Sequence, residues 1–193
     1  MNRLPILAIC GSLRADSLTG NLMDLTERIA PDLQFLGRHL VGRLPLYNAD
    51  LDSPRDLPAV VGEFRIVALA AKAVIIASPE YVYGPSGVTK NALDWLMGNG
   101  RRLNLPVLLL SASQGETGGL RGLAALIDPV QQLGGRLLDP MTFAHAAGRF
   151  GAHGQSADHI ALERLELALE QLRLAVATPL PIPGAQLLRP SPD

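Results

Sequence analysis

The chain has 193 residues, of which 48% are hydrophobic and 4% aromatic, and its formal net charge is -1. This length and apolar content predict a single globular domain with an aliphatic core and exclude a disordered chain. The near-neutral charge argues against a nucleic acid or an anionic membrane surface as the main partner.

Because Cys10 is the only cysteine in the sequence, we expect neither an internal disulfide bond nor a cysteine-based metal cluster. The apolar runs are too short to span a bilayer. Turn residues directly after Cys10 interrupt any signal-peptide pattern near the start of the sequence. We therefore expect a cytoplasmic protein.

Short apolar runs and helical patterns alternate along the chain. The predicted strands are 4–10, 33–41, 73–78, 106–113 and 136–141, and the predicted helices are 17–30, 57–71, 86–97, 120–133 and 156–177. The strand at 33–41 is the most polar and is expected at an edge of the sheet, while Pro45 keeps the segment 44–51 out of a central strand. This alternation predicts a doubly wound parallel α/β sheet in one domain, 1–177, followed by a Pro-rich tail, 178–193.

The first predicted strand ends in a small polar turn, 11–14, that leads directly into a helix. Backbone N–H groups at a helix N-terminus lack partners within the helix, and the helix dipole favours negative charge there. Ser12, Ser17 and Thr19 add hydroxyl groups, and Arg14 adds a forked cation suited to phosphate. The turn has neither a Gly-x-Gly-x-x-Gly fingerprint nor a P-loop. It indicates a phosphate cradle of another kind, with a plain turn capped by Ser17 as the alternative.

Two more loops follow apolar strands. In the loop 79–87, Tyr81 and Tyr83 could flank a flat ligand with their rings, or could simply pack the loop onto the sheet. The segment 111–115 is small and rich in donors, which suits close approach of the backbone to a planar ligand. Ligands of open parallel sheets bind beyond the carboxyl ends of the strands. The three loops form one cleft if the first, third and fourth strands are neighbours.

No side-chain catalytic machinery is visible in the sequence. The four histidines lack metal-ligand spacing, and no Gly-x-Ser-x-Gly elbow of an esterase is present. Cys10 is expected in the core, and Lys90 with Asp94 as a structural helix pair. A phosphate cradle without an acid, base or nucleophile indicates that a bound cofactor does the chemistry, so we predict neither a catalytic residue nor a metal ligand.

Four motifs in register resemble the NADPH-dependent FMN reductase family: G-S-L-R-x-x-S at 11–17, L-P-L-Y-N-x-D-L at 44–51, P-E-Y-x-Y at 79–83 and K-N-A-L-D-W at 90–95. The resemblance implies a flavodoxin-like sheet of five parallel strands in the order 2-1-3-4-5. It implies FMN bound without covalent attachment and hydride taken from NADPH or NADH. Quinones, azo compounds, metal oxyanions or free flavin would be the acceptors, reduced by a ping-pong mechanism. It also implies a homodimer or homotetramer with FMN at the subunit interface.

The same resemblance assigns cofactor-binding roles to individual residues. The first loop would hold the FMN phosphate through Ser12, Arg14, Ser17 and Thr19, with Leu18 as a further cofactor contact. The isoalloxazine ring would be bordered by Pro79, Glu80, Tyr81 and Val82, and along its other edge by Ser113 and Gly115. The residues expected to serve packing and the oligomer interface are Asn91, Asp94 and Trp95.

Four residues depart from the pattern of that family. Thr19 and Val82 stand where the family often has Asn, so Thr19 keeps a side-chain donor whereas Val82 loses one. Ser86 and Thr89 replace residues that are usually apolar. The change at Val82 bears on the tuning of the flavin and on the choice of substrate more than on flavin binding.

Two other functions stay open on the sequence alone. A flavodoxin-like electron carrier would bind FMN without NAD(P)H activity, but such carriers are typically acidic and this chain is nearly neutral. A non-catalytic FMN-binding protein on the same fold is the second alternative, because a fold does not determine a function.

Overall fold

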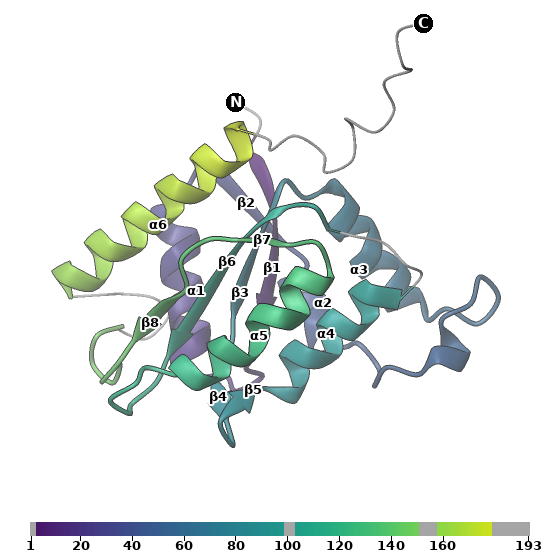
Figure 1. Cartoon of the computed structure of the whole chain (residues 1–193), viewed down its shortest axis with the longest axis horizontal. Helices are drawn as coiled ribbons and strands as arrows, with labels where there is room; N and C mark the ends of the chain where they lie inside the picture. The colour runs from purple at the N-terminus through teal and green to yellow at the C-terminus, as the bar shows by residue number, and fades with distance from the viewer. Residues whose placement is uncertain (1–2, 99–102, 151–157, 179–193) are drawn as a thin grey trace, which may run out of the picture.

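A parallel sheet forms the centre of the molecule (Figure 1). The computed structural model describes residues 3–98, 103–150 and 158–178. The strands of the sheet are β1 (Leu4–Cys10), β2 (Leu33–Leu36), β3 (Ala73–Ala77), β6 (Pro106–Ala112), β7 (Arg136–Leu137) and β8 (Met141–Phe143). Their order is β2-β1-β3-β6-β7, β8 also pairs with β6, and all of these pairings are parallel. The predicted flavodoxin-like order 2-1-3-4-5 is therefore confirmed.

Helices cover both faces of the sheet because the strands alternate their side chains between two apolar cores. One core joins the sheet to α1 (Leu18–Ile29) and α6 (His159–Ala177). The other joins it to α2 (Arg38–Val41), α3 (Ala59–Ala70), α4 (Gly87–Met97) and α5 (Leu120–Gln132). In β1, Ile6 belongs to the first core and Leu7 to the second. This burial on both faces explains why the central strands are apolar throughout.

Three predicted elements differ from the structure. The strand predicted at 33–41 ends at Leu36, because Gly37 adopts a left-handed φ of 82° and the chain turns into α2. The strand predicted at 136–141 is divided into β7 and β8, and Pro140, which has no N–H to donate to a ladder, lies between them. The loop 79–87 contains a small antiparallel hairpin, β4 (Glu80–Tyr81) and β5 (Gly84–Pro85).

Some predicted elements lie at or beyond the ends of the residue ranges that the structure describes. The helix predicted from 156 begins at His159, after Asp158 as its N-cap, and the residues just before Asp158 lie outside the described ranges. So do the predicted helix end at 99–100 and the tail from 179 onward. Among the helices that the structure describes, none combines the length and apolarity needed to cross a lipid bilayer.

The second and fourth motifs of the sequence pack against each other. The Asn91 carboxamide accepts a hydrogen bond from the Tyr47 N–H (2.8 Å) and donates one to the Pro45 carbonyl (2.9 Å). The buried Trp95 donates its indole N–H to the same carbonyl at 2.7 Å. Segment 44–51, which contains the 3-10 helix η1 (Ala49–Leu51), is thereby fixed to α4. The predicted packing role of Asn91 and Trp95 is confirmed.

Candidate functional site

A cavity of about 200 Å³ lies beyond the carboxyl ends of β1, β3 and β6. We call it the carboxyl-edge cavity. The residues that line it are Ser12, Arg14, Ser17, Leu18, Thr19, Pro79, Glu80, Tyr81, Ala112, Ser113 and Gln114. They come from three loops far apart in the sequence, which meet because β1 and β6 both pair with β3. The expected convergence of these loops on one cleft is thus confirmed.

The first loop presents hydrogen-bond donors and one cation to the cavity. The Ser17 hydroxyl caps α1 by accepting from the Gly20 N–H at 2.8 Å, as the alternative interpretation of this turn predicted. The N–H groups of Leu18 and Thr19, the first two helical residues, have no acceptor inside the helix. Arg14 is exposed and makes no hydrogen bond or ion pair with any residue that the structure describes. A cap and a phosphate cradle are therefore compatible at this helix end.

A buried cluster of three hydroxyl groups holds the first loop against the second. We call Ser78, Ser86 and Thr89 the hydroxyl cluster. The Thr89 hydroxyl donates to that of Ser78 at 3.0 Å and lies 3.0 Å from that of Ser86. Gly11 packs directly on the cluster, since a Cβ atom there would lie 2.1 Å from the Thr89 oxygen. The departures at Ser86 and Thr89 thus build a contact between the two loops.

The second loop is anchored by its glutamate. The Glu80 carboxylate accepts a hydrogen bond from the Gly122 N–H at 3.0 Å, in the first turn of α5. The N-cap of that helix is Gly119, which has no side chain to cap it. Glu80 therefore supplies the negative charge and the acceptor that the helix end needs. Sequence reasoning missed this structural role of Glu80.

The hairpin formed by β4 and β5 turns at two residues with left-handed backbones. Val82 has a φ of 51° and Tyr83 a φ of 59°, and their side chains are 100% and 69% exposed. Type I′ turns need this backbone and normally use Asn or Gly, so a β-branched residue here is strained. The guanidinium of Arg121 lies over the Tyr83 ring, with Cζ 4.3 Å from the ring centroid. Tyr83 thus contacts α5 rather than packing on the sheet.

The third loop is held by its own polar groups and by β8. The Ser113 hydroxyl accepts from the Gly115 N–H at 2.9 Å, and the Ser113 N–H donates to the Phe143 carbonyl at 3.1 Å. Ala112 and Gln114 line the cavity beside Ser113 although no role was predicted for them individually. They belong to the donor-rich segment 111–115, which is the signal that identified this loop.

Two predicted cofactor residues do not line the carboxyl-edge cavity. Val82 is fully exposed at the tip of the hairpin, and Gly115, whose N–H donates to the Ser113 hydroxyl, is not among the lining residues. Cys10 is 5% exposed and belongs to the core, as predicted. In the described part of the chain, no group of three or more His, Cys, Asp or Glu residues is arranged to hold a metal ion.

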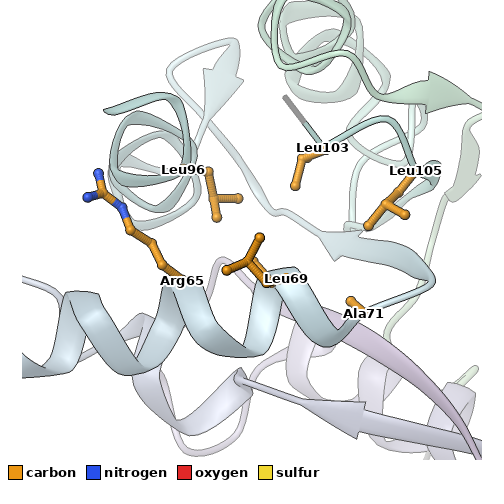
Figure 2. Close-up of a pocket in the computed structure, with 7 residues that line it drawn as sticks. Arg65, Leu69, Ala71, Leu96, Leu103 and Leu105 are labelled. Atoms are coloured by element: carbon orange, nitrogen blue, oxygen red, sulfur yellow. The ribbon is translucent and has the colours of Figure 1, made fainter. Parts of the chain in front are cut away.

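A second cavity, of about 100 Å³, lies at the opposite edge of the sheet (Figure 2). Ala71, which precedes β3, and Leu105, which precedes β6, are among its lining residues. Arg65, the charged residue among the described residues that line it, binds the Asp52 carboxylate (2.7 and 2.9 Å) and the Trp95 carbonyl (2.9 Å). This ion pair lowers the pKa of Asp52 below its usual value, through the hydrogen bonds from Arg65. An apolar cavity with an engaged cation is unsuited to a phosphorylated ligand. The carboxyl-edge cavity is the candidate site because hydroxyl donors and Arg14, which has no partner among the described residues, line it.

Comparisons with known proteins find similar sequences and a similar solved structure. A family model described as NADPH-dependent FMN reductase matches residues 4–149. An NAD(P)H-dependent FMN reductase of Pseudomonas aeruginosa is 30% identical over 177 residues, covering 90% of this chain and 95% of the relative. An NADPH:quinone oxidoreductase of Arabidopsis thaliana is 32% identical over 186 residues, covering 87% and 89%. The solved structure of FerB, a flavoenzyme NAD(P)H:(acceptor) oxidoreductase of Paracoccus denitrificans, matches with a TM-score of 0.80 and 26% identity, covering 89% of this chain and 96% of FerB.

Proposed function

The chain belongs to the NADPH-dependent FMN reductase family, and on this premise we propose that it uses FMN, held in the carboxyl-edge cavity, to reduce small-molecule acceptors with NAD(P)H. Family membership makes the protein an NAD(P)H-dependent flavoenzyme of the FMN reductase and quinone reductase type. The observation that supports this site is the meeting of a donor-rich helix start with two loops at the carboxyl edge of the sheet. Dinucleotides and mononucleotides bind at this edge in doubly wound folds.

The residues around the cavity fit the chemistry of FMN. In this proposal the phosphate lies at the start of α1, where Arg14 has no competing carboxylate among the described residues. The hydroxyl groups of Ser12, Ser17 and Thr19 and the first N–H groups of α1 complete the donor set. Pro79 and Tyr81 would border one edge of the ring, and Ser113 the other. Glu80 would contribute its backbone, because its carboxylate is engaged with α5.

The bound flavin supplies the hydride chemistry, and no acid, base or nucleophile of the chain is required for it. The residues of the chain instead orient the cofactor and keep one face of the cavity apolar. We propose quinones, azo compounds, metal oxyanions or free flavin as the acceptors. Because nucleotide and acceptor would use the same face in turn, we propose a ping-pong mechanism. Parallel lines in double-reciprocal plots at several acceptor concentrations are the expected result, and converging lines would contradict it.

We also propose that the protein forms a homodimer or homotetramer with the carboxyl-edge cavity at the interface. The exposed apolar side chains beside this cavity support the proposal: Leu13 is 63% exposed, Tyr81 50% and Val82 100%. Apolar surface of this kind next to a site is typical of interaction surfaces. Sedimentation equilibrium of the purified protein measures the number of subunits.

Since the reaction consumes NAD(P)H, we propose that it takes place in the cytoplasm.

One experiment tests the function directly. The purified protein is expected to show the visible spectrum of bound FMN, or to acquire it when FMN is added. Stopped-flow mixing with NADPH or NADH is then expected to bleach the flavin within the turnover time. A colourless protein that takes up no FMN would overturn the proposal, and FMN binding without bleaching would indicate an electron carrier instead.

A further inference from the structure

Arg121 is a cation beside the candidate site that no carboxylate of the described residues neutralises. Its guanidinium is exposed and lies 4.3 Å from the centroid of the Tyr83 ring. The next residue, Gly122, donates its N–H to Glu80, which lines the carboxyl-edge cavity. Arg121 is therefore fixed at the rim of this cavity by two contacts between α5 and the hairpin.

The position is unfavourable for a cation in the isolated chain. Arg121 lies in the first turn of α5, where the helix dipole opposes positive charge, and that turn holds no acidic residue. The Glu80 carboxylate, which caps this turn through the Gly122 N–H, offsets part of that effect but forms no ion pair with Arg121. The contact with the ring leaves the N–H groups of the Arg121 guanidinium without a hydrogen-bond acceptor among the described residues, and such a fork of N–H groups binds phosphate oxygens in pairs. An anionic ligand at this rim would relieve the unfavourable charge.

We propose that Arg121, held on the Tyr83 ring, binds the 2′-phosphate of NADPH and so makes the enzyme prefer NADPH to NADH. The proposal rests on the proposed function. The 2′-phosphate is the only chemical difference between the two nucleotides, and arginine is the residue that accommodates it in other dinucleotide sites. The 2′-phosphate is on the adenosine half of NADPH, remote from the nicotinamide. The residue that binds it is therefore expected at the rim of the cavity rather than in its interior. Arg14, which lines the carboxyl-edge cavity, is assigned to the FMN phosphate and so is not assigned to the 2′-phosphate as well.

The test compares Arg121→Gln with wild type in the FMN-loaded protein. The ratio of kcat/KM for NADPH to that for NADH is expected to fall about tenfold in the variant, through the KM for NADPH. The values for NADH are expected to stay within about twofold. Arg121→Lys keeps the charge without the fork and is expected to lie between the two proteins.

Two controls accompany the kinetics. Arg173→Gln removes an arginine that pairs with Asp32 just before β2, at the opposite edge of the sheet, and should leave the ratio unchanged. Calorimetric titration of the FMN-loaded protein with adenosine 2′,5′-bisphosphate and with 5′-AMP gives a readout that needs no turnover. Arg121→Gln is expected to weaken binding of the bisphosphate about tenfold and to leave the affinity for 5′-AMP unchanged.

Each outcome is informative. An unchanged nucleotide ratio in a folded Arg121→Gln variant overturns the proposal. Equal losses with NADPH and NADH also overturn it, because they assign Arg121 to the pyrophosphate that both nucleotides share. If neither nucleotide bleaches the wild-type flavin, the proposed function fails, and the bisphosphate titration still decides whether Arg121 is a ligand of the 2′-phosphate.

Discussion

At the scale of single residues, Arg14 gives the most direct prediction, because it is the charged side chain that we assign to the FMN phosphate. Arg14→Ala is expected to weaken FMN binding by about 1.5–3 kcal/mol, the range of a charge-assisted hydrogen bond. Titration of the apoprotein with FMN, followed by quenching of flavin fluorescence, measures the change. The unfolding midpoint of the apoprotein should stay the same, since Arg14 is exposed and has no partner among the described residues. An unchanged FMN affinity would show that Arg14 does not contact the phosphate.

Also at this scale, Val82 holds a backbone conformation that its side chain disfavours. Val82→Asn is expected to stabilise the protein by about 0.5–1 kcal/mol, because Asn adopts the left-handed region far more readily than a β-branched residue. Urea denaturation of the apoprotein measures the difference. Val82→Ile, which keeps the branch, serves as the matched control and should show no gain. A loss of stability in Val82→Asn would mean that this turn is not strained.

At the scale of elements, the contact between Glu80 and α5 ties the hairpin to a helix of the core. Glu80→Ala leaves the Gly122 N–H without its acceptor and removes the negative charge from the helix start. The free energy of unfolding is expected to fall by about 1–2 kcal/mol, as measured by denaturant unfolding of the apoprotein. Glu80→Gln keeps an acceptor oxygen and should lose about half as much. The exposed Glu116, which has no partner in the described chain, provides the control, and an equal effect of Glu116→Ala would refute the capping role.

The elements also show what the sequence could predict. Continuously apolar strands predicted β1, β3 and β6 within a residue or two, and the small or polar residues directly after these strands identified the three loops of the site. The hairpin at 80–85 escaped prediction because its turn, Val82-Tyr83, lacks the Asn or Gly that marks a type I′ turn. The Glu80 cap escaped as well, since its partner lies 42 positions further along the chain, on another element. Local patterns thus predicted the framework, whereas contacts between distant elements required the structure.

At the scale of the whole molecule, the ion pair between Asp52 and Arg65 links segment 44–57 to α3 and α4. Both side chains are largely buried, at 7% and 12% exposure. Because Arg65 lowers the pKa of Asp52 in the folded state, the pair stabilises the fold above the unfolded pKa, and this contribution is lost as the pH falls through the folded pKa. Asp52→Asn is expected to cost about 1.5–3 kcal/mol at neutral pH and much less at an acidic pH below the folded pKa of Asp52.

Denaturant unfolding of the wild type and Asp52→Asn at both pH values measures this dependence. Asp56→Asn is the matched control, because the pair of Asp56 with Arg55 is on the surface, where Arg55 is 90% exposed. Surface pairs contribute little, so Asp56→Asn should leave the free energy of unfolding almost unchanged at either pH. A cost of Asp52→Asn that does not change with pH would contradict the ionic origin of the stabilisation.

The hydroxyl cluster of Ser78, Ser86 and Thr89 has a consequence for the kinetics of cofactor exchange. Its hydrogen bonds join the end of β3 to the start of α4, and Gly11, directly after β1, packs on them. The two loops therefore lose their conformational freedom when the chain folds, and little remains to be lost on association with FMN. A site ordered in this way favours a high association rate constant for FMN, because no folding step has to precede binding. It also lets FMN dissociate and rebind without unfolding of the surrounding loops. The folded apoprotein is therefore expected to contain a preformed FMN site, so that its folding does not depend on FMN.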